Sequence, residues 1–136
     1  MMRKIQFEDL TETIVCREND TAMEVARILR DTNARHLIVL ADENKPSGII
    51  STTDINNRIV AEGKDIIKTK AKDFMTKDIV RISKSSELAD AIVKMSERNI
   101  SSLPVIDENS QLVGVLEFTN ALRALNKYEK QLKEGE

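Results

Sequence analysis

The sequence predicts a mixed α/β (α+β) fold made of two similar strand-helix-strand-strand-helix units that share one core. Short apolar runs such as 37–40 are typical of buried strands, and between them lie segments with apolar residues at helical spacing. The same order of elements then occurs again in the second half of the chain. A repeat of this length indicates two units that pack on one another, because each alone is too small to bury its sheet.

The first unit is expected to begin with a lead-in segment at 5–13. A capping-box spacing from Thr21 to Glu24 marks the start of a helix that runs to Arg30. Turn-forming residues at 42–47 separate two apolar runs and predict a hairpin-like pair of strands. The expected strands are 14–16, 37–40 and 48–50, and the expected second helix is 54–60.

The second unit follows a lead-in at 72–80. Gly48 is separated from Gly114 by the same interval as Leu37 from Leu103, so the register holds over the helix, both strands and the turn. The interval from Val15 to Val80 is shorter by one position, which predicts a single inserted residue near the second strand–helix connection. The expected elements are a helix at Leu88–Glu97, strands at 103–106 and 112–116, and a C-terminal helix at Thr119–Leu132.

Composition narrows the class of protein. The chain has 136 residues, of which 40% are hydrophobic and 32% charged, as in a soluble globular domain. A net charge of −2 and only four aromatic residues disfavour nucleic-acid binding. One cysteine, Cys16, fits a reducing compartment, and we see no membrane-spanning run or signal peptide. We therefore expect a cytoplasmic protein with no membrane contact.

The stretch from Gly48 to Asp54 is the candidate functional motif. It ends a buried strand and opens a helix with hydroxyl side chains and a carboxylate. Free backbone N–H groups at such a turn bind anions, and a carboxylate accepts hydrogen bonds from a sugar diol. Plain helix capping explains the same residue types. The recurrence of the stretch further along the chain favours the functional interpretation.

The doubled pattern resembles a pair of CBS domains, the tandem unit called a Bateman module. The lead-in at 73–80, the segment at 100–107 and the two glycine-centred strands carry the resemblance. It covers nearly the whole chain and implies a stand-alone pair, packed through its sheets with pseudo-two-fold symmetry and a cleft on each side. The implied boundaries are repeat 1 at 8–62, a linker at 63–72, repeat 2 at 73–126, and a helix end and tail at 127–136.

The resemblance implies an adenosine-containing ligand, which is AMP, ADP, ATP or S-adenosylmethionine, and the sequence does not distinguish these from one another or from NADH. The family pattern of glycine, two apolar residues, Ser/Thr, two variable residues and Asp is complete at Gly48, Ser51 and Asp54. Asp54 is then expected to accept from ribose hydroxyls, and Ser51 or Thr52 to hold a phosphate or ribose oxygen. The residues expected to sandwich an adenine ring are Ile14, Val15 and Ile38.

Arg35 and His36 precede the buried strand, where the family often directs polar side chains into the cleft. Arg35 is either a bidentate phosphate contact or a solvated loop arginine. His36 lacks a partner at metal-ligand spacing, so we expect no metal site and a structural or backbone-capping histidine. Lysines 64, 68, 70 and 72 either attract polyphosphate or form a solvated linker.

The second repeat departs from the pattern. Gly114 is kept, but Glu117 stands at the position of Ser51 and Asn120 at that of Asp54. Glu117 would repel a phosphate, so we expect a site that is empty, degenerate or selective for a less charged ligand. We interpret both residues as ordinary helix-start residues. Ser102 and Pro104 complete this second site.

We therefore predict a regulatory, energy-sensing type of module rather than an enzyme, since the sequence shows no catalytic triad, metal cluster or phosphate loop. Binding would shift the population between two arrangements of the repeats, which a regulated protein partner would read. The family also implies a flat homodimer. The alternative is a structural or protein-interaction module without ligand, in which the charged C-terminal helix is the functional surface.

Overall fold

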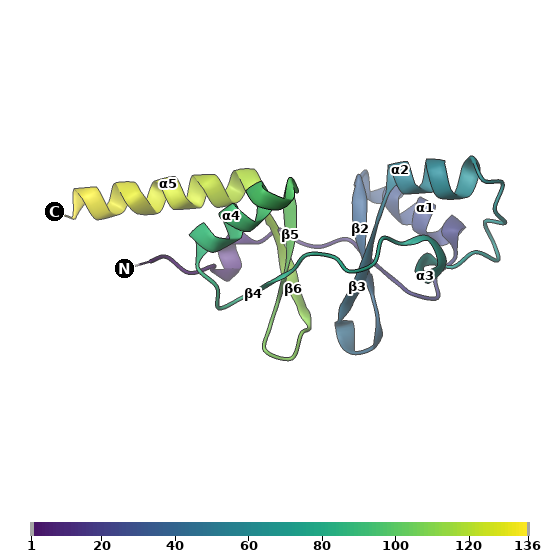
Figure 1. Ribbon diagram of the computed structural model, residues 1–136, viewed down its shortest axis with the longest axis horizontal. Coiled ribbons are helices and arrows are strands. Elements are labelled where there is room, and N and C mark those ends of the chain that lie inside the picture. The colour runs from purple at the N-terminus through teal and green to yellow at the C-terminus, as the bar shows by residue number, and fades with distance from the viewer. Residues whose placement is uncertain (1, 136) are drawn as a thin grey trace. The chain divides into compact units, whose positions relative to one another are not determined.

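The computed structural model describes residues 2–135, which divide into two compact units (Figure 1). The first-repeat unit spans Thr13–Ile79. The second-repeat unit combines the N-terminal segment up to Glu12 with the chain from Val80 onward. Each unit contains one three-stranded sheet with helices, as the sequence predicts. The units differ from the sequence repeats because each unit contains the lead-in segment that begins the other repeat.

The first-repeat unit has the strand order β1-β2-β3, with β1 parallel and β3 antiparallel to the central β2. The helices cover one face of this sheet (Figure 1). Its elements are β1 (Val15–Arg17), α1 (Ala22–Thr32), β2 (His36–Leu40), η2 (Asp42–Asn44), β3 (Pro46–Ser51), α2 (Thr52–Asp54), the π-helical η3 (Ile55–Val60) and α3 (Ala71–Phe74).

The second-repeat unit repeats this arrangement with the strand order β4-β5-β6. Its elements are η1 (Phe7–Asp9), β4 (Ile82–Ser83), α4 (Leu88–Arg98), β5 (Ser102–Ile106), β6 (Leu112–Glu117) and α5 (Phe118–Glu134). The expected strands and helices are thus confirmed, with ends that differ by a few residues.

Local sequence explains where the helices begin and end. The predicted capping box forms at the start of α1, where the Glu24 N–H donates to the Thr21 hydroxyl and the Thr21 N–H to the Glu24 carboxylate, both at 3.1 Å. The helix ends at Asn33, whose φ of 55° is left-handed. Asn99, the equivalent residue of the second repeat, ends α4 in the same way with a φ of 53°.

Most of the buried apolar residues that the structure describes form two clusters, one between sheet and helices in each unit, rather than the one shared core that the sequence predicts. In the first-repeat unit, Val25 and Leu29 of α1 pack against Leu37 and Val39 of β2 and against Ile50 of β3. The corresponding residues of the second-repeat unit are Ala91, Met95, Leu103, Val105 and Leu116. Burial of these side chains from water is the main force that holds each helical layer on its sheet.

Strand pairing corrects the position of the inserted residue. Cys16 pairs with Val39, and Ile82 pairs with Val105, so the full repeat interval already holds at the first strand of each unit. The shorter interval relates the lead-ins, because Thr11 pairs with Val115 and Thr76 with Ile49. The extra residue therefore precedes β4 rather than following it. Asp78, with a φ of 54°, lies in this stretch.

Cys16 lies on β1 with only 3% of its surface exposed. Burial away from water raises the pKa of the Cys16 thiol to about 12, with a smaller contribution from Asp20. We expect the folded protein to resist a thiol reagent at pH 8 and the unfolded chain to react at once. Rapid labelling of the native protein would contradict this burial.

The same shift gives a pH dependence. The thiol of the unfolded chain ionises near its ordinary pKa of 9.0, well before that of the folded protein. The neutral thiol therefore makes its full contribution to the free energy of unfolding below about pH 9, and this contribution is lost as the pH rises toward 12. We expect the unfolding midpoint of the wild type to fall more steeply over this range than that of a Cys16→Ala variant.

Candidate functional site

The motif predicted from the sequence forms a strand-to-helix turn between β3 and α2. The backbone N–H of Ser51 donates to Asp54 Oδ2 at 2.8 Å, and the N–H of Asp54 donates to Ser51 Oγ at 3.1 Å. These two bonds form a capping box, so helix capping is one role of Ser51 and Asp54. They also fix the orientation of the Asp54 carboxylate.

The second carboxylate oxygen of Asp54 retains acceptor capacity. Oδ1 lies 3.6 Å from Nε of Arg58, one helical turn further on, which is an ion-pair contact but longer than a hydrogen bond. The side chain of Asp54 is 18% exposed, so the carboxylate group is partly open to solvent. An oriented and partly exposed carboxylate of this kind suits a pair of hydroxyl donors.

The structure brings most of the predicted first-site residues to one edge of the β1-β2-β3 sheet. Thr52 N–H donates to the carbonyl of Arg35 at 2.9 Å, and His36 pairs with Ser51 across the sheet. Ile38 N–H donates to the carbonyl of Ile14 at 3.0 Å. The first residues of β1 and β2 therefore lie at the same end of the sheet as the last residues of β3, where the motif is.

Their side chains do not all point the same way. Ile14 packs against the core cluster, on the same side of the sheet as Cys16 and Leu37. Val15 and Ile38 alternate with those residues, pair with each other and face the opposite side. Arg35 is exposed, and its carbonyl accepts the hydrogen bond from the turn. His36 is half-buried.

Gly48 has a structural role that the motif alone does not show. It pairs with Val39 three residues before the turn, and the lead-in crosses directly over it. A β-carbon at this position would overlap Sδ of Met75 and lie 2.9 Å from the carbonyl oxygen of Thr76. Close backbone approach is therefore sufficient reason for this glycine.

The second turn has a different chemistry. Phe118 N–H donates to the carbonyl of Ser101 at 2.8 Å, as Thr52 does to Arg35 in the first unit. Glu117 occupies the cap position of α5, and its side chain makes no capping hydrogen bond among the described residues. Asn120 Oδ1 accepts from Nη1 of Arg123 at 3.0 Å.

The two remaining residues of the predicted second site lie on β5. Ser102 pairs with Glu117, and Pro104 pairs with Val115. The second turn keeps the backbone hydrogen bond of the first turn. In place of the Asp54 carboxylate it has the Asn120 amide, whose oxygen accepts a hydrogen bond from Arg123.

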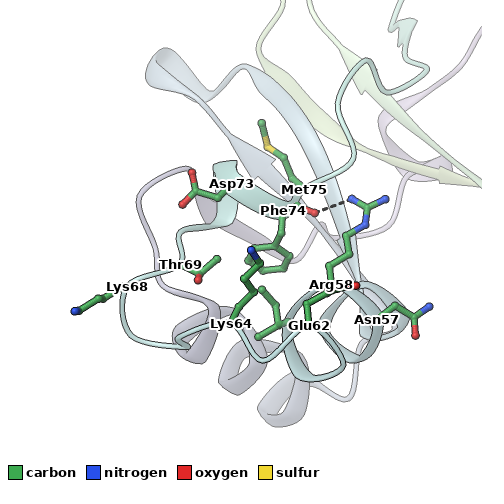
Figure 2. A pocket seen from close by; sticks show the side chains of 10 residues that line it. Asn57, Arg58, Glu62, Lys64, Lys68, Thr69, Asp73, Phe74 and Met75 are labelled. Atoms are coloured by element: carbon green, nitrogen blue, oxygen red, sulfur yellow. Dashed lines mark hydrogen bonds between the residues drawn. The ribbon is translucent and has the colours of Figure 1, made fainter.

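A surface cavity of about 520 Å³ lies in the first-repeat unit, beside η3 and α3 (Figure 2). None of the residues predicted to bind ligand lines it. Two lysines of the linker, Lys64 and Lys68, do, together with Arg58. The only sequence signal for this cavity was the lysine-rich composition of the linker. Its other lining residues are Asn57, Ile59, Glu62, Thr69, Asp73, Phe74 and Met75.

Metal-binding clusters and membrane-spanning helices are both absent from the part of the chain that the structure describes. Residues 2–135 contain no group of three or more His, Cys, Asp or Glu side chains placed to hold a metal ion. Over the same residues, every helix is too short or too polar to cross a bilayer.

Curated relatives share this sequence over most of its length. The uncharacterized protein MK0525 of Methanopyrus kandleri is 24% identical over 90% of this chain and 63% of its own. A homoserine O-acetyltransferase of Methanococcus vannielii is 34% identical over 76% of this chain and 21% of its own. This chain thus spans less than two thirds of either relative.

A solved structure supports the same relationship. The CBS domain pair of protein MJ0100, in complex with 5′-methylthioadenosine and S-adenosyl-L-methionine, is 26% identical. It superposes with a TM-score of 0.72 over 94% of this chain and 99% of its own. The CBS domain family model matches residues 7–61 and again residues 71–127. The chain therefore belongs to the CBS domain family and carries two copies of the domain in tandem.

Proposed function

We propose that this chain is a regulatory ligand-sensing module that binds an adenosine-containing ligand at the Gly48–Asp54 turn. The observation that carries the proposal is the state of the Asp54 carboxylate. One oxygen is held by the N–H of Ser51 at 2.8 Å, while the other lies 3.6 Å from Nε of Arg58, beyond hydrogen-bond length, on a side chain that is 18% exposed. A ribose presents two neighbouring hydroxyl donors, which such a carboxylate binds with charge-assisted hydrogen bonds.

The choice of ligand class follows from the relative with known ligands. Both molecules in the MJ0100 complex, 5′-methylthioadenosine and S-adenosyl-L-methionine, contain adenosine. What they share is the adenine ring and the ribose diol. Asp54 suits the diol and half-buried Val15 suits the ring, whereas Ile38, only 2% exposed, has little surface to offer a ligand. AMP, ADP and ATP contain the same parts, and Ser51 and Thr52 offer hydroxyls for a phosphate.

The second turn is expected to bind such a ligand more weakly or not at all. Asn120 is neutral and already accepts from Arg123. The carboxylate of Glu117, half-buried at the start of α5, disfavours a phosphate nearby. The first turn is therefore the working site of the proposal.

Signalling would follow from a difference in affinity. A ligand that binds one arrangement of the two repeats more tightly stabilises that arrangement, by no more than the difference in binding free energy. A regulated protein, or a second copy of the chain in a homodimer, would respond to that arrangement. If the ligand is AMP, ADP or ATP, the module is an energy sensor.

Thermal unfolding in the presence of adenosine compounds tests the proposal. We expect at least one of S-adenosylmethionine, 5′-methylthioadenosine, AMP, ADP and ATP to raise the temperature of the unfolding midpoint. At a ligand concentration 100 times Kd, the free energy of unfolding should increase by about 2.7 kcal/mol. Asp54→Asn keeps the acceptor for Ser51 but removes the charge. It should weaken binding by roughly 10- to 100-fold, because hydrogen bonds to charged groups contribute about 1.5–3 kcal/mol.

Asn120→Ala is the matched control, since it changes the equivalent position of the second turn. It should leave the ligand-induced shift unchanged. A shift that is kept in Asp54→Asn and lost in Asn120→Ala would place the site at the second turn instead. No shift with any of the five compounds would favour the protein-interaction module, with α5 as its functional surface.

A further inference from the structure

Arg58 joins two parts of the first-repeat unit that are distant in sequence. Its Nη1 donates to the carbonyl oxygen of Phe74 at 2.7 Å, as the dashed line in Figure 2 shows. Its Nε lies 3.6 Å from Oδ1 of Asp54. One guanidinium group thus contacts both the carboxylate of the proposed site and the backbone at the end of α3.

On the side of the site, Arg58 completes the positioning of Asp54. The N–H of Ser51 holds Oδ2, and the guanidinium faces Oδ1. A cation at this distance attracts the carboxylate and restricts its rotation, without consuming the acceptor in a short hydrogen bond. A ligand hydroxyl on Oδ1 would therefore meet an oriented anion.

Arg58 also donates a hydrogen bond to the lead-in segment of the second repeat, at Phe74. Phe74 is the last residue of α3, where a carbonyl has no partner within the helix. The next residues are tied to the sheet, since Thr76 N–H donates to the carbonyl of Ile49 at 2.9 Å. This segment continues to Val80, the first residue of the second-repeat unit after the linker.

The second-repeat unit shows that the fold does not require this arginine. Ala124 stands at the position equivalent to Arg58 and packs against the core of its unit. The same unit has Asn120 at the position of Asp54. The turn that we expect not to bind ligand therefore lacks both the carboxylate and an arginine at the position of Arg58, and Arg123, one position earlier, contacts Asn120 instead.

We propose that Arg58 is a positioning residue, which orients Asp54 for the ligand and couples occupancy of the site to the lead-in segment from Phe74 to Ile79. The inference rests on the proposed function, because it assumes a ligand on Asp54. Arg58 then acts in two ways, through the charge it presents to Asp54 and through its hydrogen bond to the Phe74 carbonyl.

The test combines ligand affinity with amide hydrogen exchange, using S-adenosylmethionine as the probe. The Thr76 amide reports on the lead-in, and the Thr11 amide, which donates to Val115 at 2.8 Å, is the reference in the other unit. In the wild type, ligand should slow exchange at Thr76 and not at Thr11. Arg58→Gln should bind about tenfold more weakly and, at saturation, show no slowing at Thr76.

Two variants separate the roles. Arg58→Lys keeps the charge but is too short to serve both contacts, so affinity should partly recover while the slowing at Thr76 does not. Arg123→Gln removes the exposed arginine beside Asn120 and should leave both readouts as in the wild type. An Arg58→Gln variant with wild-type affinity and wild-type slowing at Thr76 would overturn the inference alone. A wild type that fails to bind would overturn the proposed function itself.

Discussion

Replacing Arg3 by methionine is expected to lower the free energy of unfolding by about 3–5 kcal/mol. Arg3 forms a bidentate pair with Asp9, with Nη1 at 2.6 Å from Oδ2 and Nη2 at 2.9 Å from Oδ1. The two side chains are only 13% and 5% exposed. Methionine fills similar space but leaves a buried carboxylate whose one remaining hydrogen-bond donor among residues 2–135 is the N–H of Gln6 at 2.8 Å. Denaturant unfolding measures the loss.

A double variant separates the cost of the unpaired charge from that of lost packing. Asp9 occupies the lead-in position that Phe74, a core residue, fills in the other repeat. Arg3→Met combined with Asp9→Leu should therefore recover most of the stability, because apolar residues of similar volume often replace a buried ion pair without loss. A loss below about 1 kcal/mol in Arg3→Met alone would show that water reaches Asp9 and that the pair contributes little.

The Arg3–Asp9 pair illustrates what the sequence could not predict. Strands and helices follow from local periodicity and caps, as at Thr21 and Glu24, and the repeat relates the two units residue by residue. Which segment completes which unit is a tertiary property. The bonds from Ile5 N–H to Ser86 and from Leu88 N–H to Arg3 join the N-terminal segment to the start of α4, and no local pattern marks them.

At the candidate site, too, the sequence predicts the local motif but not the tertiary contacts. The sequence located the turn from Gly48 to Asp54, because its residue types and its recurrence are both visible in one chain. It did not predict that Ile14 packs into the core rather than facing the same side as Val15. It also could not reveal Arg58, because the group that this arginine binds is a distant backbone carbonyl, which has no side-chain signature.

Replacing Gly48 by alanine is expected to lower the free energy of unfolding by about 1–3 kcal/mol, the usual cost of forcing an extra group into a packed region. The new β-carbon would overlap Sδ of Met75, and that side chain can move. It would also lie 2.9 Å from the carbonyl oxygen of Thr76, which is held by the bond from Ile49 N–H at 3.0 Å. The lead-in must therefore shift away from β3, and denaturant unfolding measures the cost.

Gly114→Ala is the matched control, because the lead-in of the other unit crosses it in the same way but less closely. There the new β-carbon would lie 3.1 Å from the side chain of Leu10 and 3.3 Å from the carbonyl oxygen of Thr11. We expect a smaller loss of stability than at Gly48. Equal losses would mean that the Met75 side chain and the Thr76 carbonyl both yield easily. An unchanged stability in Gly48→Ala, together with weaker binding of S-adenosylmethionine, would instead assign this glycine to the ligand site, since close approach of the lead-in would then no longer explain it.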